Sequence, residues 1–131
     1  MPKGKGWTAV TPDEQEWKTP SWMPPEVPRR IVELTEVTQM EHMRGHLWKF
    51  PPGVTGRKHL HTQQEEIFVV IEGEFTMTLG EEAAEVVLGP RSVVVLSPNT
   101  PIHIRNDSAH DAVAFMVGAP PVRGDGVVLE G

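Results

Sequence analysis

The sequence predicts an all-β protein, a jelly-roll barrel of the double-stranded β-helix type. From residue 30 onward, short segments rich in β-branched residues alternate apolar with polar positions, and turn-forming residues separate them. No connector has room for a crossover helix, and closely spaced strands without helices are typical of antiparallel sandwiches and barrels. The eight expected strands are 31–37, 46–50, 66–71, 75–79, 85–88, 92–96, 102–105 and 111–117.

The two ends of the chain differ from this barrel, which we expect to span residues 30–118. Residues 1–29 hold six prolines, which exclude a long helix and predict an extended arm. Trp7, Trp17 and Trp22 lie in this arm, and we expect it to pack on the barrel or on a second subunit, because large aromatic rings are costly to expose. The Pro/Gly-rich tail 119–131 is expected to add an edge strand or to lie on a neighbour.

The composition is that of a soluble globular protein and argues against several partners. The 131 residues are 38% hydrophobic and 23% charged, and 18 acidic against 12 basic residues give a net charge of −6, which disfavours nucleic acid. There is no cysteine, so any metal ligands must be nitrogen or oxygen atoms. Neither an apolar leader nor a membrane-spanning run is visible, so we expect no membrane association and a cytoplasmic location.

A group of titratable residues directly precedes an apolar strand. His59 and His61 alternate with Leu60, so on a strand their side chains share a face with Cα atoms roughly 7 Å apart. Glu66 has the parity of apolar residues in the following strand, where an isolated ionised carboxylate would be costly to bury. Two imidazoles and one carboxylate favour an open divalent metal site. Alternatively, both histidines lie on an exposed face.

The spacing of these residues has a family counterpart. The stretch 53–73 resembles the first motif of the cupin superfamily. Its pattern is Gly53, five residues, His59, one residue, His61, four residues, Glu66, six residues and Gly73. The resemblance implies that His59, His61 and Glu66 bind a divalent metal inside a small β-barrel. Glu65 is the alternative carboxylate ligand, since some members have one residue fewer before the glutamate.

A second cupin-like motif runs from Pro90 to Asn106, and the resemblance as a whole covers residues 47–117. Here Ile102 occupies the position of the family's last metal-binding histidine, and His103 follows one residue later. His103 is a candidate fourth ligand, but a one-residue offset in a strand puts its side chain on the other face unless a bulge intervenes.

Four further residues are candidates for contacting a substrate: His46, Trp48, Phe68 and Arg105. His46 and Trp48 share a strand face with each other, and this face either lines the pocket or is solvated. Apolar residues around Phe68 suggest a partly hydrophobic small molecule. We expect His42 to be a solvated surface residue.

The sequence therefore predicts a metal-binding cupin with a small-molecule pocket. The cofactor would be one divalent transition metal, Fe, Mn, Ni, Zn or Cu, and the chemistry would be of the dioxygenase or isomerase type. The alternatives are a non-catalytic small-molecule sensor and a structural dimer module with a degenerate metal site. The resemblance and the tryptophan-bearing arm together favour a homodimer.

Overall fold

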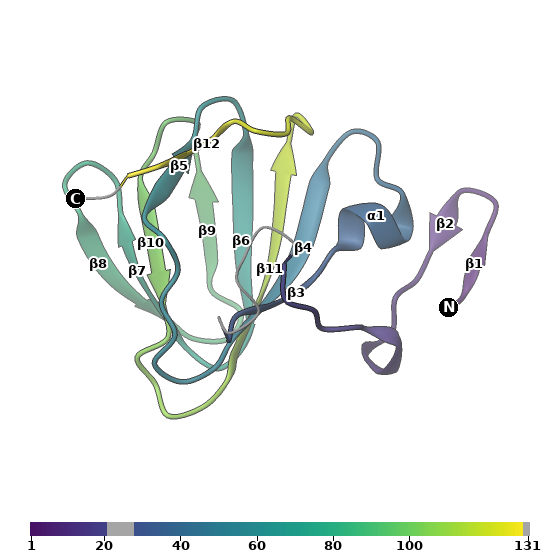
Figure 1. Cartoon of the computed structure of the whole chain (residues 1–131), viewed down its shortest axis with the longest axis horizontal. Coiled ribbons are helices and arrows are strands. Elements are labelled where there is room, and N and C mark those ends of the chain that lie inside the picture. The colour runs from purple at the N-terminus through teal and green to yellow at the C-terminus, as the bar shows by residue number, and fades with distance from the viewer. Residues whose placement is uncertain (21–27, 130–131) are drawn as a thin grey trace.

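Two five-stranded antiparallel sheets enclose the core in the computed structural model, which describes residues 1–20 and 28–129 (Figure 1). The first sheet has the order β12 (Gly126–Val128), β5 (His59–His61), β10 (Ile102–Arg105), β7 (Phe75–Leu79) and β8 (Ala84–Leu88). The second has the order β3 (Arg30–Val32), β4 (Arg44–Phe50), β11 (Ala112–Ala119), β6 (Glu65–Glu72) and β9 (Val93–Leu96). The predicted all-β jelly-roll fold is confirmed.

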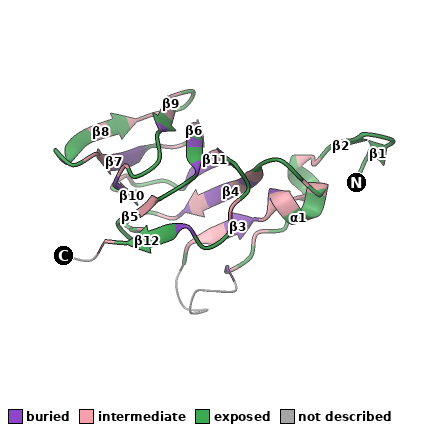
Figure 2. Ribbon diagram, turned by 90° about the horizontal axis from the view of Figure 1, so that it is seen from above, coloured by how far each residue is buried: buried purple, intermediate pink, exposed green. Residues whose placement is uncertain are grey.

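Strand alternation decides which side chains form the core between the sheets. In β6, Phe68 and Val70 point inward and are buried, whereas Ile67 is 40% exposed. In β10, Ile102 and Ile104 point inward, and in the neighbouring strand β7 of the same sheet Phe75 and Met77 are fully buried. Figure 2 shows the buried segments in the facing strands and the exposed ones at the rims.

Gly73 closes the hairpin between β6 and β7. Its φ is 70°, in the left-handed region that favours glycine, and an added Cβ would collide with the carbonyl oxygen of Asp111. The glycine predicted to end the first motif is thus required both by the turn and by the close approach of another chain segment.

The strand predicted over residues 31–37 is wrong in its second half. Strand β3 ends at Val32, and the short helix α1 (Leu34–Thr38) follows, with its C-cap Gln39 in the left-handed region at φ 57°. Leu34 is buried on the outer face of the second sheet, and this burial stabilises the helical turn. The alternating sequence pattern did not indicate it.

The described part of the N-terminal arm lies partly on its own barrel. Lys18 forms a bridge to Ile31 beside β3, and Trp17 packs on the apolar cluster of Val32, Leu34 and Leu47. Before it come the 3-10 turn η1 (Pro12–Glu14) and the hairpin of β1 (Lys3–Gly4) and β2 (Trp7–Thr8), which stands away from the barrel (Figure 1).

The three arm tryptophans therefore have different outcomes. Trp17 packs on the barrel as expected, whereas Trp7 is 55% exposed in the described chain, so its packing on a second subunit stays a prediction. Trp22 lies outside the described residues. In that described part, the helices are too short and too polar for a membrane-spanning segment.

Candidate metal and small-molecule site

The two motif histidines lie on the inner face of the first sheet. His59 is directly opposite Ile102 in the antiparallel pair of β5 and β10, and opposite residues point to the same side. Ile102 belongs to the core, so His59 and His61 also point toward the interior. The ring centroids of the two histidines are 5.4 Å apart at an interplanar angle of 84°.

Glu66 faces these histidines from the second sheet. It is 6% exposed, whereas Glu65 points outward and is exposed. One Glu66 carboxylate oxygen, Oε1, lies 3.7 Å from His61 Nε2. Burial raises the pKa of Glu66, and the nearby Asp125 adds to this rise, whereas His61 and Arg44 oppose it.

His61 is held from behind by a residue that the sequence did not identify. Its Nδ1 lies 2.8 Å from Oδ1 of Asp125, whose side chain is 1% exposed. The other carboxylate oxygen of Asp125 accepts hydrogen bonds of 3.0 Å from the backbone N–H groups of Gln63 and Gln64. Burial alone would raise the pKa of Asp125, but the hydrogen bonds from His61, Gln64 and Gln63 outweigh it and the net pKa is lowered.

No local signal in the sequence could have linked Asp125 to His61. The pair is separated by 64 positions, and a Gly-Asp-Gly stretch predicts only a turn. Pairing of β12 with β5 brings them together, with Gly126 opposite His61. The tail thus does form an edge strand, and this strand also delivers a carboxylate to the site.

The Nδ1 atoms of both histidines are engaged. His59 Nδ1 lies 2.9 Å from the carbonyl oxygen of Arg57, which can only accept, so this nitrogen carries the proton. The ionised Asp125 is also only an acceptor, so the Nδ1 of His61 carries the proton as well. Each Nε2 therefore keeps its lone pair, the arrangement that metal-binding histidines adopt. Burial lowers the pKa of His59, which favours the neutral imidazole that a metal requires.

His103 is not brought to this group. Ile102 points inward, so His103 lies on the outer side of β10, paired with Thr78. Its Nε2 lies 3.0 Å from the carbonyl oxygen of Gly56. The one-residue offset seen in the sequence therefore persists in the structure, because β10 continues regular pairing with β7 through this region.

The predicted substrate-contact residues divide into two groups. His46, Trp48 and Phe68 point into the barrel, where Trp48 and Phe68 are buried in the core. Arg105 instead lies on the outer side of its strand, with ion pairs to Glu85 at 3.1 Å and Asp107 at 2.7 Å. Its alternation with the inward Ile104 turns it away from the barrel interior.

His46 adds a polar group to the inner face. Register across β11 places it in line with Met116 and Phe68, and its Nδ1 lies 3.1 Å from Oε1 of Glu33. Burial, and to a lesser extent Arg44, lower the pKa of His46 to about 4. His46 is thus neutral at pH 7, whereas His42, as expected, is a solvated side chain.

The candidate ligand atoms are of the types that a divalent transition metal binds, but they do not converge on one position that an ion could occupy. Two imidazole Nε2 atoms and one buried carboxylate are suitable ligands for such an ion. Within residues 1–20 and 28–129, however, no three His, Asp or Glu side chains lie close enough together to hold a metal ion. Metal binding would therefore require side-chain movement.

The fold and this inner-face arrangement identify the class of protein. The cupin domain family matches residues 46–118, more than half of the chain, and the chain belongs to this family. Cupin domains commonly bind a metal. No protein with a curated description matches the chain.

Several solved structures are similar. The protein called "Putative sugar phosphate isomerase" from Acidithiobacillus ferrooxidans is 26% identical, with a TM-score of 0.70, over 84% of this chain and 73% of that one. A cupin-superfamily sugar phosphate isomerase from Silicibacter pomeroyi is 20% identical, with a TM-score of 0.72, over 85% and 74%. The polyketide cyclase RemF from Streptomyces resistomycificus is 13% identical, with a TM-score of 0.81, over 95% and 87%.

Proposed function

We propose that this cupin is a metal-dependent enzyme of the isomerase type that acts on a small polar molecule. The observation that carries the proposal is the buried Glu66 carboxylate facing His61 Nε2, with the Nδ1 atoms of His61 and His59 both fixed by acceptors. An unpaired buried carboxylate is costly, and a divalent cation held by these three side chains would offset that cost.

The proposed division of labour uses residues on both sheets. His59, His61 and Glu66 would hold the metal, which supplies Lewis-acid polarisation of a substrate carbonyl or hydroxyl oxygen. Asp125 holds the His61 ring so that Nε2 faces Glu66. The neutral His46 can donate a hydrogen bond to a substrate oxygen without carrying charge.

Glu33 is the candidate general base. Burial, helped by Glu36, raises its pKa above the ordinary value, which makes the carboxylate a better proton acceptor. It lies beside His46 and lines a cavity at the edge of the barrel. Its proposed role is to take a proton from the hydroxyl-bearing carbon next to the polarised carbonyl and return it to the carbonyl carbon, while the hydroxyl proton passes to the former carbonyl oxygen.

Polar groups inside the barrel favour an enzyme over a passive sensor. A sensor for an apolar ligand needs only an apolar lining, whereas here Arg44 and His46 point inward beside Glu66. The similarity to the protein from Acidithiobacillus ferrooxidans, at 26% identity, supports the isomerase type rather than the dioxygenase type.

A second candidate is a structural cupin with a degenerate metal site. It is favoured by the inward Ile102 and by the lack of a converged three-ligand group within the described residues.

Both candidates are compatible with a homodimer, which we also propose. Val93 and Val95 of the edge strand β9 are 58% and 60% exposed, and Ile67 lies opposite Val95, so this outer stripe offers a surface for a second copy.

The homodimer is tested by sedimentation. The full chain is expected to sediment as a dimer, and Val95→Lys as a monomer with an unchanged circular dichroism spectrum. Removal of residues 1–27 is also expected to shift the chain toward monomer or aggregate. A dimer that survives both changes with undiminished stability would contradict the roles of the stripe and the arm.

Metal analysis tests the proposed enzyme. Protein purified without chelators is expected to contain close to one divalent metal per chain, and His59→Ala, His61→Ala and Glu66→Gln are each expected to lose most of it. His42→Ala is the matched control, because this histidine is solvated. Sub-stoichiometric metal that the three variants leave unchanged would favour the structural candidate.

A further inference from the structure

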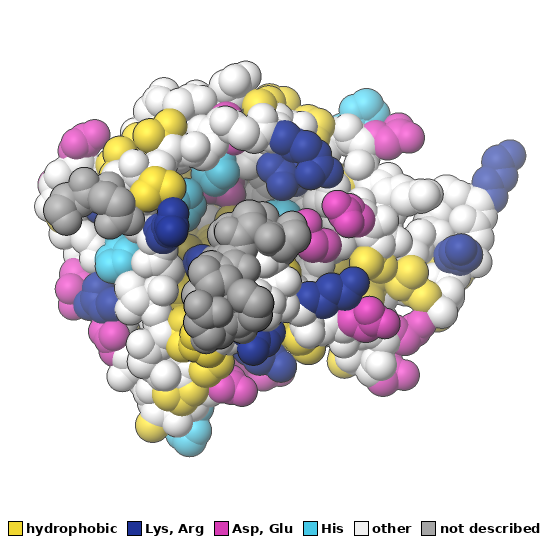
Figure 3. Space-filling view, in the orientation of Figure 1, with side chains coloured by type: hydrophobic (Ala, Val, Ile, Leu, Met, Phe, Trp, Pro, Cys, Tyr) yellow, Lys and Arg dark blue, Asp and Glu magenta, His cyan; other side chains and the backbone are white. Residues whose placement is uncertain are grey.

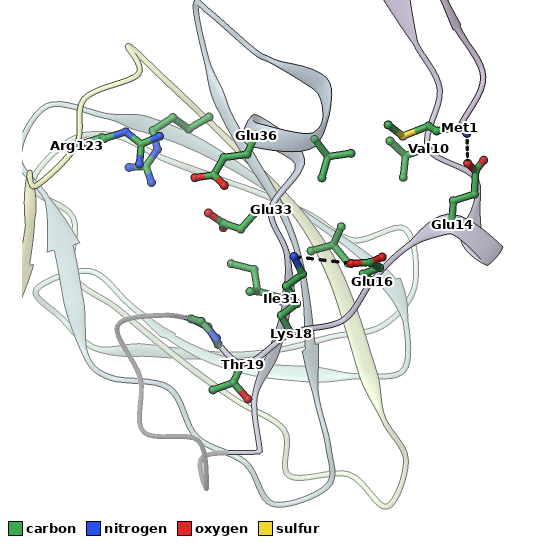
Figure 4. Close-up of a pocket in the computed structure, with 14 residues that line it drawn as sticks. Met1, Val10, Glu14, Glu16, Lys18, Thr19, Ile31, Glu33, Glu36 and Arg123 are labelled. Carbon is green, nitrogen blue, oxygen red and sulfur yellow. Dashed lines mark ion pairs between the residues drawn. The ribbon is translucent and has the colours of Figure 1, made fainter.

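A cavity of about 540 Å³ lies between the N-terminal arm and the barrel, outside the core (Figure 4). Its walls come from the arm, from β3 and α1, and from single residues of β4 and the C-terminal tail. The volume is in the range of small-molecule pockets. Figure 3 shows acidic and basic side chains next to one another on this face, over β4, β11 and α1.

The charged groups at the two ends of this cavity differ in their pairing. At the arm end, the Met1 amino group is paired with Glu14 at 2.6 Å, and Lys18 lies 3.8 Å from Glu16. At the other end lie Arg123, Glu33 and Glu36 (Figure 4). Arg44 also belongs to this end, because its Nη1 donates a 3.2 Å hydrogen bond to the carbonyl oxygen of Val122, next to Arg123.

The two guanidinium groups are short of acceptors. Within the described part of the chain, neither Arg44 nor Arg123 forms an ion pair. Arg44 Nε is buried and has no hydrogen-bond partner there, and an unpaired buried donor is costly. Burial raises the pKa of Glu33, and both arginines oppose this rise, so both positive charges act on the same carboxylate of the cavity wall.

Arg44 connects this cavity to the proposed metal site. In the second sheet it is in register with Gly118 and Glu66, so that Arg44 and Glu66 point to the same side with only a glycine between them. A ligand group bound at Arg44 would therefore lie next to the inward polar residues.

We propose that the cavity binds the anionic group of the substrate, a phosphate or a carboxylate, through Arg44 and Arg123. Guanidinium groups are suited to both anions because their N–H donors match two oxygen acceptors. Glu33 and Glu36 at the same end make the site unsuitable for a bare polyanion but suitable for a hydroxylated one, whose hydroxyl groups donate to carboxylates. The substrate class is thus a small hydroxylated anion. The reaction assigned to this substrate rests on the proposed function, whereas its binding in the cavity does not.

Calorimetric titration of the full chain after chelator treatment tests the site without the metal. The probes are ribose 5-phosphate, gluconate and, as the uncharged comparison, ribose. At least one anionic probe is expected to bind at least tenfold more tightly than ribose, and the better one assigns phosphate or carboxylate. Equal affinity for all three, or no binding of either anion, would overturn the proposal.

Substitutions locate the binding. Arg123→Gln and Arg44→Gln are each expected to weaken binding of the better anionic probe by about 10- to 100-fold, the usual loss for a charged hydrogen bond. Arg91→Gln, at an exposed turn between β8 and β9, is the matched control and should bind normally. Arg123 is exposed, so its variant is expected to keep the melting temperature, and undiminished anion binding by this variant would overturn the assignment.

A metal titration of the same proteins separates this inference from the proposed function. Arg123→Gln is expected to take up metal as the unchanged chain does. If the unchanged chain binds metal but shows no selective anion binding, only the anion site is overturned. Selective anion binding without any metal uptake would remove the proposed metalloenzyme and leave the anion site standing.

Discussion

The inner face of the second sheet differs between its two ends. Along β4 the inward residues run from Arg44 and His46 to Trp48 and Phe50, and along β6 from Glu66 to Phe68 and Val70. One end is thus charged and hydrogen-bonded, whereas the other is apolar. A single alternating pattern therefore builds both the core and the site, and burial of apolar side chains stabilises mainly the apolar end.

The apolar end is closed by aromatic packing and by one buried amide. Phe75 meets Phe50 and Phe68 edge to face, at centroid distances of 5.5 and 5.9 Å. The fully buried Asn106 donates 2.7 Å hydrogen bonds to the carbonyl oxygens of Phe50 and His110. Every buried polar group of Asn106 is therefore satisfied by a fixed partner, whereas at the polar end Arg44 Nε lacks one within the described residues.

The largest expected effect is at the apolar end. Phe75→Ala should reduce the free energy of unfolding by about 3–5 kcal/mol, because it opens a cavity among packed rings. Val87→Ala, at a side chain that is 61% exposed, is the control and should change it by less than about 0.5 kcal/mol. Chemical denaturation measures both. A Phe75→Ala protein as stable as the control would contradict the stabilising role of the apolar end.

The next effect is the pH dependence from His46. Its folded-state pKa of about 4 lies below the unfolded value of 6.5, so the unfolded chain binds more protons between these values and stability falls on acidification. The full loss from pH 7 to pH 4 is about 3 kcal/mol. His46→Gln should lack this part of the loss, whereas His42→Gln should retain it. Denaturation curves with identical pH dependence in both variants would contradict the burial of a neutral His46.

Asp125→Asn tests whether Asp125 positions the His61 ring at the polar end. The amide can present an N–H to His61 Nδ1 and thereby favour the other tautomer, so metal affinity should fall by about 10- to 100-fold. Asp107→Asn, at a carboxylate paired with Arg105 on the outside, is the matched control. Competition with a coloured chelator measures the affinity. Equal affinities of the two variants would mean that Asp125 does not position the ring.

The smallest effect expected is a gain in stability. In the metal-free chain, the raised pKa of Glu66 means that its contribution, present below the unfolded pKa, is lost as the pH rises. Glu66→Gln removes this charge, and at pH 8 the metal-free variant should be more stable than the unchanged chain by about 1 kcal/mol. Equal or lower stability, measured by denaturation with chelator present, would show that the polar end carries no such cost.

Much of the fold was predictable because strands follow a local alternation. The segments at 75–79 and 102–105 were predicted with their observed bounds, and Gly73 was predicted as a hairpin residue. The helix α1 was missed because its stabilisation comes from Leu34 packing on a distant cluster. Trp7 lies in a hairpin that stands away from the barrel, so its packing on a second subunit stays a prediction.

The site was predictable only where its residues share a motif. Parity placed His59 and His61 on one shared face and Glu66 with the apolar residues of its strand, and it also raised the doubt about His103. The inward direction of the two histidines was implied only by the family resemblance. Asp125 and Arg123 could not be found, because the tail reaches the barrel only through the pairing of β12 with β5. The outward side of Arg105 became clear only once Ile104 was placed in the core.

The most direct test of the account is a crystal structure of protein grown with divalent transition metals, with anomalous diffraction recorded at the metal absorption edges. We expect one anomalous peak inside the barrel, within bonding distance of His59 Nε2, His61 Nε2 and a carboxylate oxygen of Glu66. We also expect His61 Nδ1 to remain hydrogen-bonded to Asp125. A structure with no peak among these three side chains, or with a metal bound elsewhere and His59 and His61 turned to solvent, would contradict it.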